Sequence, residues 1–423
     1  MKIAIVGAGF TGLSAAYKLA LSGHKVVIYE KESYPGGLAS GYKEKKWEWP
    51  LERHYHHLFA SDHDMLRLCR QIGYPIRFYV PKTSTLYNSS IYQLDTPASL
   101  LSFPLLSLME KLRTGLVLAF LKATPFWQPL EKFTAQKFLS AAMGIRPWKI
   151  LWKPLFDKKF HGFSSQISAT WFWARVHYRT QSLGYPEGGF DGLSRFLAQK
   201  LTDMGVDIRY LSPIDTISLN NNQYLVKSLN KIRKYDGVIY TLPVPQLLRM
   251  ATFLSGDYKK SLFPIKGLGA VNLILSLKHQ FLSDGTYWLN INQDDLPFLA
   301  IVDHTNFIDK SHYADEHLLY IGNYLPSDHP FFNYTAEQLL SEYLPGLIKI
   351  NPEFKSSWVN KSWDWKAPYA QSVITPGFSR LVPSKITPYK NFILANIQQV
   401  YPWDRGTNYA VKIGTKAASY VKN

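Results

Sequence analysis

A glycine-rich turn, "GAGFTG", is the first stretch of the chain whose residue types and spacing suggest chemistry. Gly7 permits a tight turn, Gly9 has no side chain to keep a pyrophosphate from the backbone, and Gly12 lets a helix pack closely on a strand. The remaining residues of this predicted loop are Ala8, Phe10 and Thr11. The spacing is that of a dinucleotide-binding loop, provided that the flanking elements are a strand and a helix.

The flanking elements meet this condition. The apolar run "KIAIVG" predicts a strand, the pattern from Phe10 to Ser22 predicts a helix, and "HKVVIYE" predicts a second strand that closes at Glu30. The unpaired N–H groups at the helix N-terminus favour phosphate oxygens. Glu30 is placed to accept hydrogen bonds from ribose hydroxyls, and its charge disfavours the 2′-phosphate of NADP. We therefore expect a dinucleotide without that phosphate.

Two histidine-containing stretches are candidates for further chemistry. "LERHYHHLF" carries His54, His56 and His57, whose spacing does not suit zinc, and no cysteine partner is available, so we predict no metal. "VDHTNF" carries His304, which is either a proton donor or orienting group in a pocket, or part of a structural polar turn. No Ser/His/Asp or Cys/His arrangement is present.

The continuation after Glu30, "KESYPGGLASG", resembles the FAD-binding amine-oxidase superfamily, which includes protoporphyrinogen oxidases, phytoene desaturases and UDP-galactopyranose mutases. The resemblance implies non-covalent FAD, held here by Lys31, Gly36, Gly37 and Leu38, with the glycine pair against the diphosphate. Many members place Arg, Lys or Asn where this chain has Leu38. "GGLA" is most similar to the protoporphyrinogen-oxidase-like branch.

The resemblance extends to segments far along the chain. It implies FAD contacts from Ile214 beside the adenine, from Thr241 and Pro243 after a returning strand, and from Asn396, Arg405, Thr407 and Asn408 in a closing strand–loop–helix segment. The closing helix, about 407–421, would direct its first N–H groups at the flavin. Asn396 replaces the usual family acid. "HHLF" resembles the "HIF" segment of the mutases, which places His57, and to a lesser degree His56, against the flavin ring.

The implied fold is α/β. A Rossmann-like FAD-binding domain would be discontinuous, formed by residues 1–60, 185–245 and 375–423. Residues 61–184 and 246–374 would form an inserted, mixed α+β substrate domain. We expect the first of these inserted segments to be largely helical, and the second to include the strands "AVNLILSL" and "HLLYIGNYL" and the helix "TAEQLLSEYLPGLI".

Composition limits the partners and the compartment. Of 423 residues, 46% are hydrophobic and 19% charged, which is typical of a globular protein. The formal net charge of +17 favours an anionic partner, although no nucleic-acid module is recognisable, so we predict no nucleic acid. A single cysteine, Cys69, in an apolar helical pattern, suits the core of a protein in a reducing compartment. With the first strand beginning at once and no apolar run of membrane-spanning length, we expect a cytoplasmic protein.

One segment leaves the membrane question open. Residues 98–127 are strongly apolar but are interrupted by Pro104 and by Glu110, Lys111 and Arg113. Buried helices are the simplest interpretation, and an interfacial segment at the inner face of an anionic membrane is the alternative.

These observations favour an FAD-dependent oxidoreductase that oxidises, desaturates or reduces an apolar substrate of isoprenoid, polyprenyl-linked or porphyrin-like type. The first alternative is a UDP-galactopyranose mutase-like flavoenzyme acting without net redox on a nucleotide sugar. It is favoured by "HHLF" and the basic charge and disfavoured by the lack of a clear diphosphate-binding arginine pair. Arg175 and Arg179 are candidates for anion binding, with solvated arginines as the default. The second alternative is a protein with a purely structural flavin.

Overall fold

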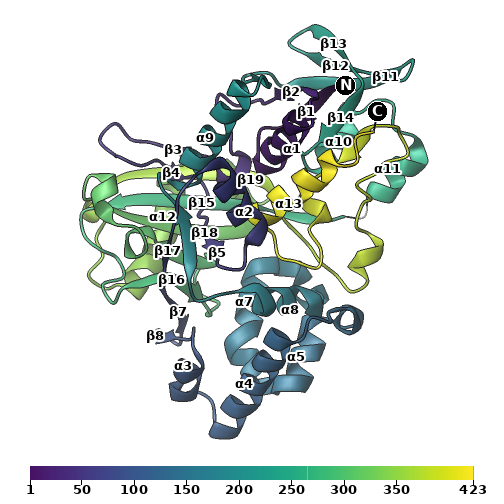
Figure 1. Ribbon diagram of the computed structural model, residues 1–423. Helices are drawn as coiled ribbons and strands as arrows, with labels where there is room; N and C mark the ends of the chain where they lie inside the picture. Colours follow the sequence, from purple (N-terminus) through teal and green to yellow (C-terminus); the bar gives the residue numbers. More distant parts are fainter. Residues whose placement is uncertain (264, 423) are drawn as a thin grey trace.

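The computed structural model describes residues 1–263 and 265–422. It contains a five-stranded parallel sheet with the strand order β10-β2-β1-β14-β20. Its strands come from three distant parts of the chain: β1 (Lys2–Val6), β2 (Lys25–Tyr29), β10 (Asp207–Arg209), β14 (Gly237–Tyr240) and β20 (Phe392–Leu394). Figure 1 shows β1 and β14 side by side with α1 and α13 running beside them. The predicted domain limits themselves remain a prediction.

Side chains alternate across this sheet and enter two cores. Ile3, Ile5 and Ile28 pack with one cluster, while Ala4 and Val6 pack with another. The first cluster receives the apolar faces of four helices: α1 (Phe10–Leu21), α2 (His63–Ile72), α9 (Gly189–Asp203) and α13 (Thr407–Ala418). The second receives three antiparallel strands and two helices: β11 (Ile214–Asn220), β12 (Gln223–Ser228), β13 (Lys231–Tyr235), α10 (Val244–Met250) and α11 (Gly256–Leu262).

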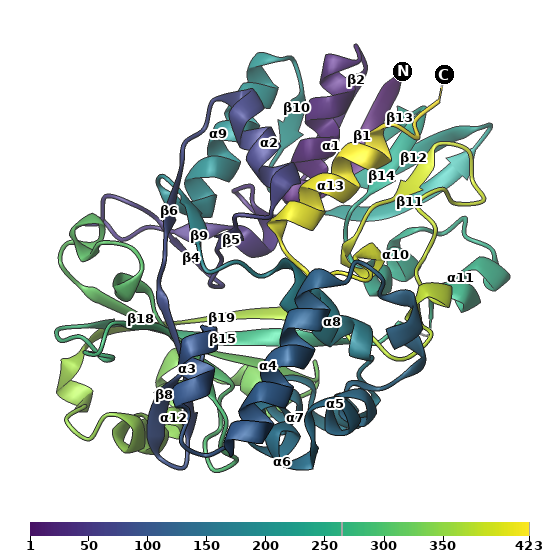
Figure 2. The ribbon, with the colours of Figure 1, turned by 60° about the horizontal axis from the view of Figure 1, so that its bottom comes forward.

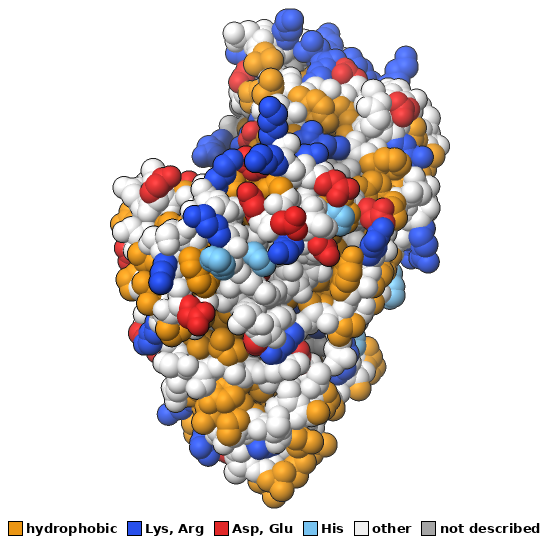
Figure 3. Space-filling view, turned by 90° about the vertical axis from the view of Figure 1, so that its left-hand side faces the viewer, with side chains coloured by type: hydrophobic (Ala, Val, Ile, Leu, Met, Phe, Trp, Pro, Cys, Tyr) orange, Lys and Arg blue, Asp and Glu red, His pale blue; other side chains and the backbone are white. Residues whose placement is uncertain are grey.

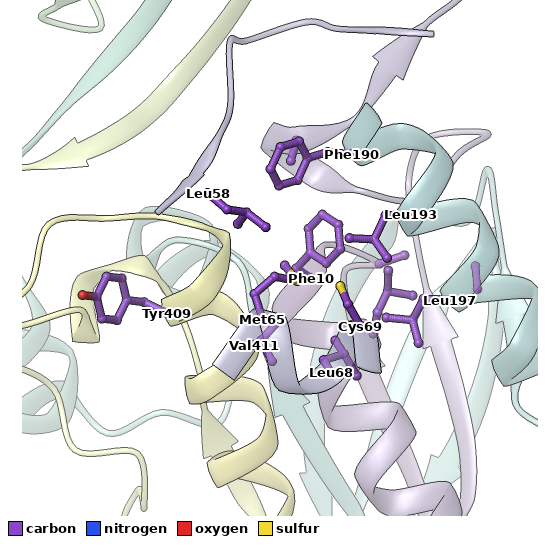
Figure 4. Close-up of a cluster of buried hydrophobic side chains, with 14 of the residues drawn as sticks. Phe10, Leu58, Met65, Leu68, Cys69, Phe190, Leu193, Leu197, Tyr409 and Val411 are labelled. Carbon is purple, nitrogen blue, oxygen red and sulfur yellow. The ribbon is translucent and has the colours of Figure 1, made fainter. Parts of the chain in front are cut away.

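The centre of the first core lies where the helices meet. Figure 4 shows Phe10 of α1 near Phe190 and Leu193 of α9, with Met65 and Cys69 of α2 close by. The rings of Phe10 and Phe190 meet edge to face with their centroids 6.3 Å apart. Cys69 is buried, as its helical pattern predicted.

A second sheet has seven strands in the order β19-β15-β18-β17-β16-β7-β8. All neighbours are antiparallel except β16 and β7. Its strands are β7 (Lys82–Tyr87), β8 (Ser90–Gln93), β15 (Gly267–Leu277), β16 (Thr286–Ile291), β17 (Ala300–Asp303), β18 (His317–Leu325) and β19 (Val359–Ser372). Helix α12 (Ala336–Ile350) packs against it, and together they confirm the strands and helix predicted for the second inserted segment.

Short strands and a helical region complete the molecule. The strands are β3 (Gly41–Tyr42), β4 (Leu51–Glu52), β5 (Leu58–Phe59), β6 (Ile76–Tyr79) and β9 (Leu183–Pro186). The helices are α3 (Pro97–Ser102), α4 (Leu108–Ala123), α5 (Ala135–Met143), α6 (Ile145–Pro147), α7 (Lys153–Phe160) and α8 (Ala169–Tyr178). Figure 2 shows α4, α5 and α8 grouped at the end of the molecule opposite the parallel sheet.

One sequence-based expectation is confirmed here and one is wrong. Residues 61–184 are largely helical, as expected, although the strands β6, β7 and β8 within 76–93 were not foreseen, and β7 pairs in parallel with β16. The segment 98–127 does not form buried helices, since only Thr114 and Leu121 of α4 are buried. Among the described residues, no helix is both long enough and apolar enough to cross a bilayer.

Candidate cofactor and substrate site

The turn between β1 and α1 is tight, as its glycines predicted. Gly7 has a φ of +99°, and a Cβ there would lie 2.8 Å from Thr241 Oγ1. A Cβ on Gly12 would overlap the carbonyl oxygen of Gly7, which explains the close approach of helix and strand. Gly9 is the N-cap of α1 and supplies no side-chain cap, so the first N–H groups of Phe10 and Thr11 remain available to a phosphate.

Glu30 stands directly after β2 and is 8% exposed. Its Oε2 accepts a hydrogen bond from the Ala8 N–H at 2.8 Å, and its Oε1 accepts one from the Glu32 N–H at 3.0 Å. The carboxylate is therefore held beside the glycine turn. Lys31 points away, pairing with Glu32 at 3.1 Å on the surface.

The double-glycine turn packs against the first glycine turn. Gly36 and Gly37 have φ values of +107° and +59°, and the Gly36 N–H donates to the Ala8 carbonyl at 2.9 Å. A Cβ on Gly37 would lie 3.2 Å from the Cα of Gly9. Leu38, in contrast, is 39% exposed. The two turns form one glycine-lined surface at the end of β1.

Arg53 is a residue that sequence reasoning missed. Its guanidinium lies 3.9 Å from the centroid of the Tyr34 ring and 4.4 Å from that of Trp365, and its Nη1 donates to Ser40 Oγ at 3.0 Å. Its Nε is buried without a partner among the described residues. A cation therefore lies beside the double-glycine turn even though Leu38 replaces the usual one. In the sequence, only its position between the double glycine and the histidines pointed to it.

Predicted contacts from distant segments meet at the carboxyl ends of β14 and β20. Thr241 Oγ1 donates to the Val6 carbonyl at 2.5 Å, and Asn396 Nδ2 donates to the Leu242 carbonyl at 3.1 Å. Pro243 follows as the N-cap of α10. Ile214 begins β11 and is buried, with Ser228 as its strand partner.

The residues around the N-terminus of α13 make different contacts. Thr407 begins the helix after Gly406, which supplies no side-chain cap. The Oδ1 of Asn408 accepts hydrogen bonds from the N–H groups of Asp64 and Met65, at 2.9 and 3.0 Å, and so holds α2 against α13. Arg405 turns toward the second sheet, where its Nη1 donates to Gln371 Oε1 at 2.7 Å.

These residues fit an FAD molecule. The uncapped α1 N-terminus and the paired glycine turns suit a diphosphate, and the Glu30 carboxylate suits a ribose.

Three histidines lie together after β4, beside the second sheet. They are only partly buried, and burial lowers the pKa of His54 to about 3, of His56 to about 4 and of His57 to about 3. His54 Nδ1 lies 2.7 Å from Asn272 Nδ2 of β15. His57 Nδ1 lies 3.2 Å from Tyr287 Oη. All three imidazoles are neutral at pH 7, so they are acceptors or neutral donors rather than cations.

His304 lies in a different, fully packed environment. It is 3% exposed, its Nε2 lies 2.9 Å from Tyr313 Oη, and burial lowers its pKa to about 3. The rings of Tyr185 and Tyr320 contact it. The structure therefore does not bring His304 and His57 into contact.

The default of solvated arginines is wrong for Arg175, whose side chain is 11% exposed. It lies 3.7 Å from Asp404 and over the ring of Trp171. Trp363 and Trp365 of β19 pack against Tyr42 of β3. No group of three or more His, Cys, Asp or Glu side chains in the described ranges is arranged to hold a metal.

Comparison with known proteins connects these features to a family. The model of the family "flavin containing amine oxidoreductase" matches residues 10–421. A 15-cis-phytoene desaturase from Synechococcus elongatus is 33% identical over 88 residues, covering 21% of this chain and 18% of that protein. A hydroxysqualene dehydroxylase from Zymomonas mobilis is 37% identical over 78 residues, covering 18% and 19%. These matches thus span about a fifth of the length of the curated relatives.

Solved structures share the fold over the whole chain. A protoporphyrinogen oxidase-like protein from Exiguobacterium sp. 255-15 superposes with a TM-score of 0.76 at 19% identity, covering 99% of this chain and 98% of that one. Reduced UDP-galactopyranose mutase superposes with a TM-score of 0.79 at 16% identity, covering 99% and 94%. The family match across the chain, which includes Glu30 and the double-glycine turn, shows that the protein belongs to the flavin-containing amine oxidoreductase family.

Proposed function

We propose that this oxidoreductase oxidises, desaturates or reduces an apolar substrate of isoprenoid, polyprenyl-linked or porphyrin-like type, which it meets at the inner face of a membrane. The observation that carries the proposal is an exposed apolar stripe on α4. We call this stripe the α4 ridge; its members are Leu108, Met109, Leu112, Leu116 and Phe120. Between 47% and 73% of each of these side chains is exposed, and four of them recur every four residues along one face.

The surroundings of the α4 ridge suit an anionic lipid surface. Phe126 and Ile145 extend the apolar area, being 69% and 65% exposed. Lys132, Lys137 and Lys149 are exposed on neighbouring elements. Figure 3 shows hydrophobic side chains gathered at the lower end of the molecule, over the helical region. Contiguous apolar surface flanked by cations is typical of proteins that bind membranes peripherally.

Contacts connect α4 to the histidines. Helix α4 packs on α8, and the Lys122 ammonium of α4 donates to the carbonyls of His177 and Arg179, at 3.0 and 2.5 Å. Arg175 of α8 and Arg179, directly after α8, in turn act electrostatically on His57. A substrate that leaves the lipid beside α4 would therefore reach the histidines by passing α8.

FAD, when bound, supplies hydride acceptance or donation at its N5. The predicted cofactor residues remain our proposed FAD contacts, and Arg53 joins them as the cation beside the double-glycine turn. We propose His57 as the group that holds or accepts a proton near the substrate, because its imidazole is neutral and only partly buried. Nε2 of His304 is already hydrogen-bonded to Tyr313 Oη, so we assign His304 a positioning role through its tyrosine neighbours.

Vesicle binding tests the membrane part of the proposal. The holoenzyme should sediment with vesicles containing phosphatidylglycerol, and the triple variant Leu112→Gln, Leu116→Gln, Phe120→Gln should bind at least about 10-fold more weakly, because three apolar side chains no longer enter the lipid. The matched control, Leu21→Gln, Leu219→Gln, Ile232→Gln, alters exposed apolar residues elsewhere and should bind normally. Equal vesicle binding by the two triple variants would contradict the proposal. So would a dimer of the unaltered protein that only the ridge variant loses, because the ridge would then be a dimer interface.

Flavin absorbance tests the redox part. Anaerobic addition of a prenylated or porphyrinogen donor should bleach the oxidised flavin, or an unsaturated acceptor should restore the colour of dithionite-reduced enzyme. His57→Gln should slow this reaction without loss of FAD. Failure of every donor and acceptor would count against an oxidoreductase of apolar compounds.

One observation favours the mutase-like alternative. Arg175 lies on α8 and Arg179 is the C-cap of the same helix, and the charge of Arg175 acts on Arg179, so the two are an arginine pair that the sequence did not show clearly. Dithionite-reduced enzyme mixed anaerobically with UDP-galactopyranose should then form the furanose isomer. No furanose after complete flavin reduction would exclude this activity.

A further inference from the structure

Four cationic side chains converge between the helical region and the loop before α13. We call them the cation cluster: Lys159 of α7, Arg175 of α8, Arg179 directly after α8, and Arg405. Lys159 Nζ lies 5.0 Å from the ring centroids of both Trp171 and Tyr324. The Arg175 guanidinium lies 5.4 Å from the ring centroid of Trp171, and that of Arg405 lies 4.4 Å from that of Tyr324. Three of the cations thus share two aromatic rings, and Arg179 follows as the C-cap of α8.

The members of the cluster differ in exposure. Lys159 is 5% exposed, and burial lowers its pKa well below its usual value. Arg405 is half-buried. Arg179 is exposed, and its guanidinium lies 5.9 Å from the ring centroid of Phe59, which in turn contacts the ring of His57. The accessible end of the cluster therefore lies beside the histidines.

The charges of the cluster are not balanced within the described part of the chain. Asp404, 3.7 Å from Arg175, is the carboxylate whose charge acts on Lys159, Arg175 and Arg179. Arg405 donates to the neutral amide of Gln371. The three arginines alone leave an excess of two positive charges over Asp404, and protonation of Lys159 makes the excess three. The nearby histidines are neutral and add none.

Such an excess is unfavourable unless an anion enters. Desolvated cations are normally paired, and like charges held together repel one another in a low-dielectric interior. The aromatic rings offset part of this cost through cation–π contacts but carry no net charge. A carboxylate would cancel one of these excess charges. A phosphate ester would cancel about two, and a diphosphate ester two or three.

We propose that the cation cluster is an anion subsite that binds the phosphate or diphosphate ester group of the substrate. Arginine forks bind phosphate oxygens through paired N–H groups, and Lys159 supplies a compact charge between the two rings. This inference rests on the proposed function, since it assigns the polar end of the substrate whose other end reaches the flavin. A prenyl diphosphate and a nucleotide sugar share this chemistry.

Calorimetric titration of the holoenzyme with inorganic pyrophosphate tests the subsite. We expect saturable one-to-one binding that weakens at least about 10-fold in Arg179→Gln and in Lys159→Met, because each removes a charge-assisted contact. Arg179→Lys, which keeps the charge, should recover part of the affinity. The control Lys137→Met removes an exposed lysine from α5 and should bind pyrophosphate like the unaltered protein.

Two results would overturn the inference. One is the absence of saturable pyrophosphate binding to folded, FAD-loaded protein. The other is a loss of FAD from Arg179→Gln, measured by flavin absorbance, with unchanged pyrophosphate affinity, which would mean that the cations serve the cofactor. Unfolding of Lys159→Met would leave Arg179→Gln and Arg179→Lys to decide.

Further ligands distinguish the source of the phosphate and separate this inference from the proposed function. Tighter binding of geranyl diphosphate than of UDP supports a lipid-linked substrate, and the reverse order supports a nucleotide sugar; both outcomes support the subsite. Pyrophosphate binding without any flavin bleaching would refute the redox proposal alone. Bleaching by an uncharged apolar donor without pyrophosphate binding would refute the subsite alone.

Discussion

Glu52 of β4 is hydrogen-bonded to residues of three other elements, β9, α9 and β18. Its Oε1 accepts a hydrogen bond from the Phe190 N–H, and its Oε2 accepts one from Tyr185 Oη, both at 2.6 Å. Its backbone carbonyl accepts a third from Tyr320 Oη at 2.6 Å. The side-chain donors favour the ionised form, but burial outweighs them and raises the pKa of Glu52 to about 7.

The variant Glu52→Gln should flatten the dependence of stability on pH. The folded-state pKa lies above the usual value of 4.5, so the folded protein holds the extra proton and its stability falls as pH rises from about 4.5 through about 7. Without ionising, the amide oxygen can still accept from the Phe190 N–H, and the amide N–H₂ can donate to Tyr185 Oη in place of accepting from it. The free energy of unfolding, measured in urea, should fall between pH 5 and pH 8 in the unaltered protein. In the variant, this fall should be smaller by up to about 3 kcal/mol.

Glu353→Gln, at an exposed position, serves as the control and should keep the slope of the unaltered protein. If Glu52→Gln shows that same slope, the raised pKa of Glu52 is refuted.

At the scale of elements, the cofactor site depends on the crossing of α1 and α13. A Cβ on Gly414 of α13 would overlap the Thr11 carbonyl oxygen and Ser14 Oγ of α1. Ser14 Oγ also donates to the Val411 carbonyl at 3.3 Å. Glycine thus allows the two helices to approach closely, so that their uncapped N-termini lie at the same end of the parallel sheet.

Gly414→Ala should destabilise the protein by about 1–3 kcal/mol, because the added methyl group forces the helices apart. FAD retention should fall with it. Gly115→Ala in α4 is a matched control, since its nearest neighbour would be Leu100 Cδ2 at an ordinary 3.8 Å. There alanine should be neutral or stabilise by up to about 1 kcal/mol, as expected for a helix interior. Urea unfolding and FAD release check both, and equal effects of the two changes would refute the role of this crossing.

At the scale of the whole molecule, burial shifts the pKa values of titratable groups in both directions. Burial lowers the pKa of four histidines, His54, His56, His57 and His304, to between about 3 and about 4. Burial raises the pKa of Glu52 and of Asp303 to about 7. The two sets act in opposite directions as pH falls, and the histidines outnumber the acids.

The holoenzyme should therefore lose stability as pH falls from about 6.5 to about 4.5. In that range the unfolded chain protonates the four histidines and the folded protein does not, which favours unfolding; the two buried acids oppose this only in part. His304→Gln should reduce the slope by about one proton, or about 1.4 kcal/mol per pH unit. His63→Gln, on the exposed side of α2, should not change it. Unfolding in urea at a series of pH values measures the slope, and a slope unchanged by His304→Gln would contradict the neutral buried state.

The sequence predicted the parts of the site that depend on local geometry. The turn at Gly7, Gly9 and Gly12 needs only adjacent elements, and β1, α1 and β2 form where the pattern placed them. The α13 start at Thr407 was likewise predicted, although the helix ends at Ala418 rather than near 421. The strands at 76–93 were missed because β7 is stabilised by pairing with β16, far away in the sequence.

By itself, then, the sequence determined the dinucleotide turn, the acidic residue beside it and the family, because residue type and short spacing dictate those features. Only the tertiary structure decided what the remaining polar residues do. It buried Arg175, placed Arg53 beside the double-glycine turn and gathered Lys159 with three arginines from separate elements. It also left the apolar face of α4 uncovered. Burial and charge balance depend on neighbours distant in the chain, and local patterns carry no information about them.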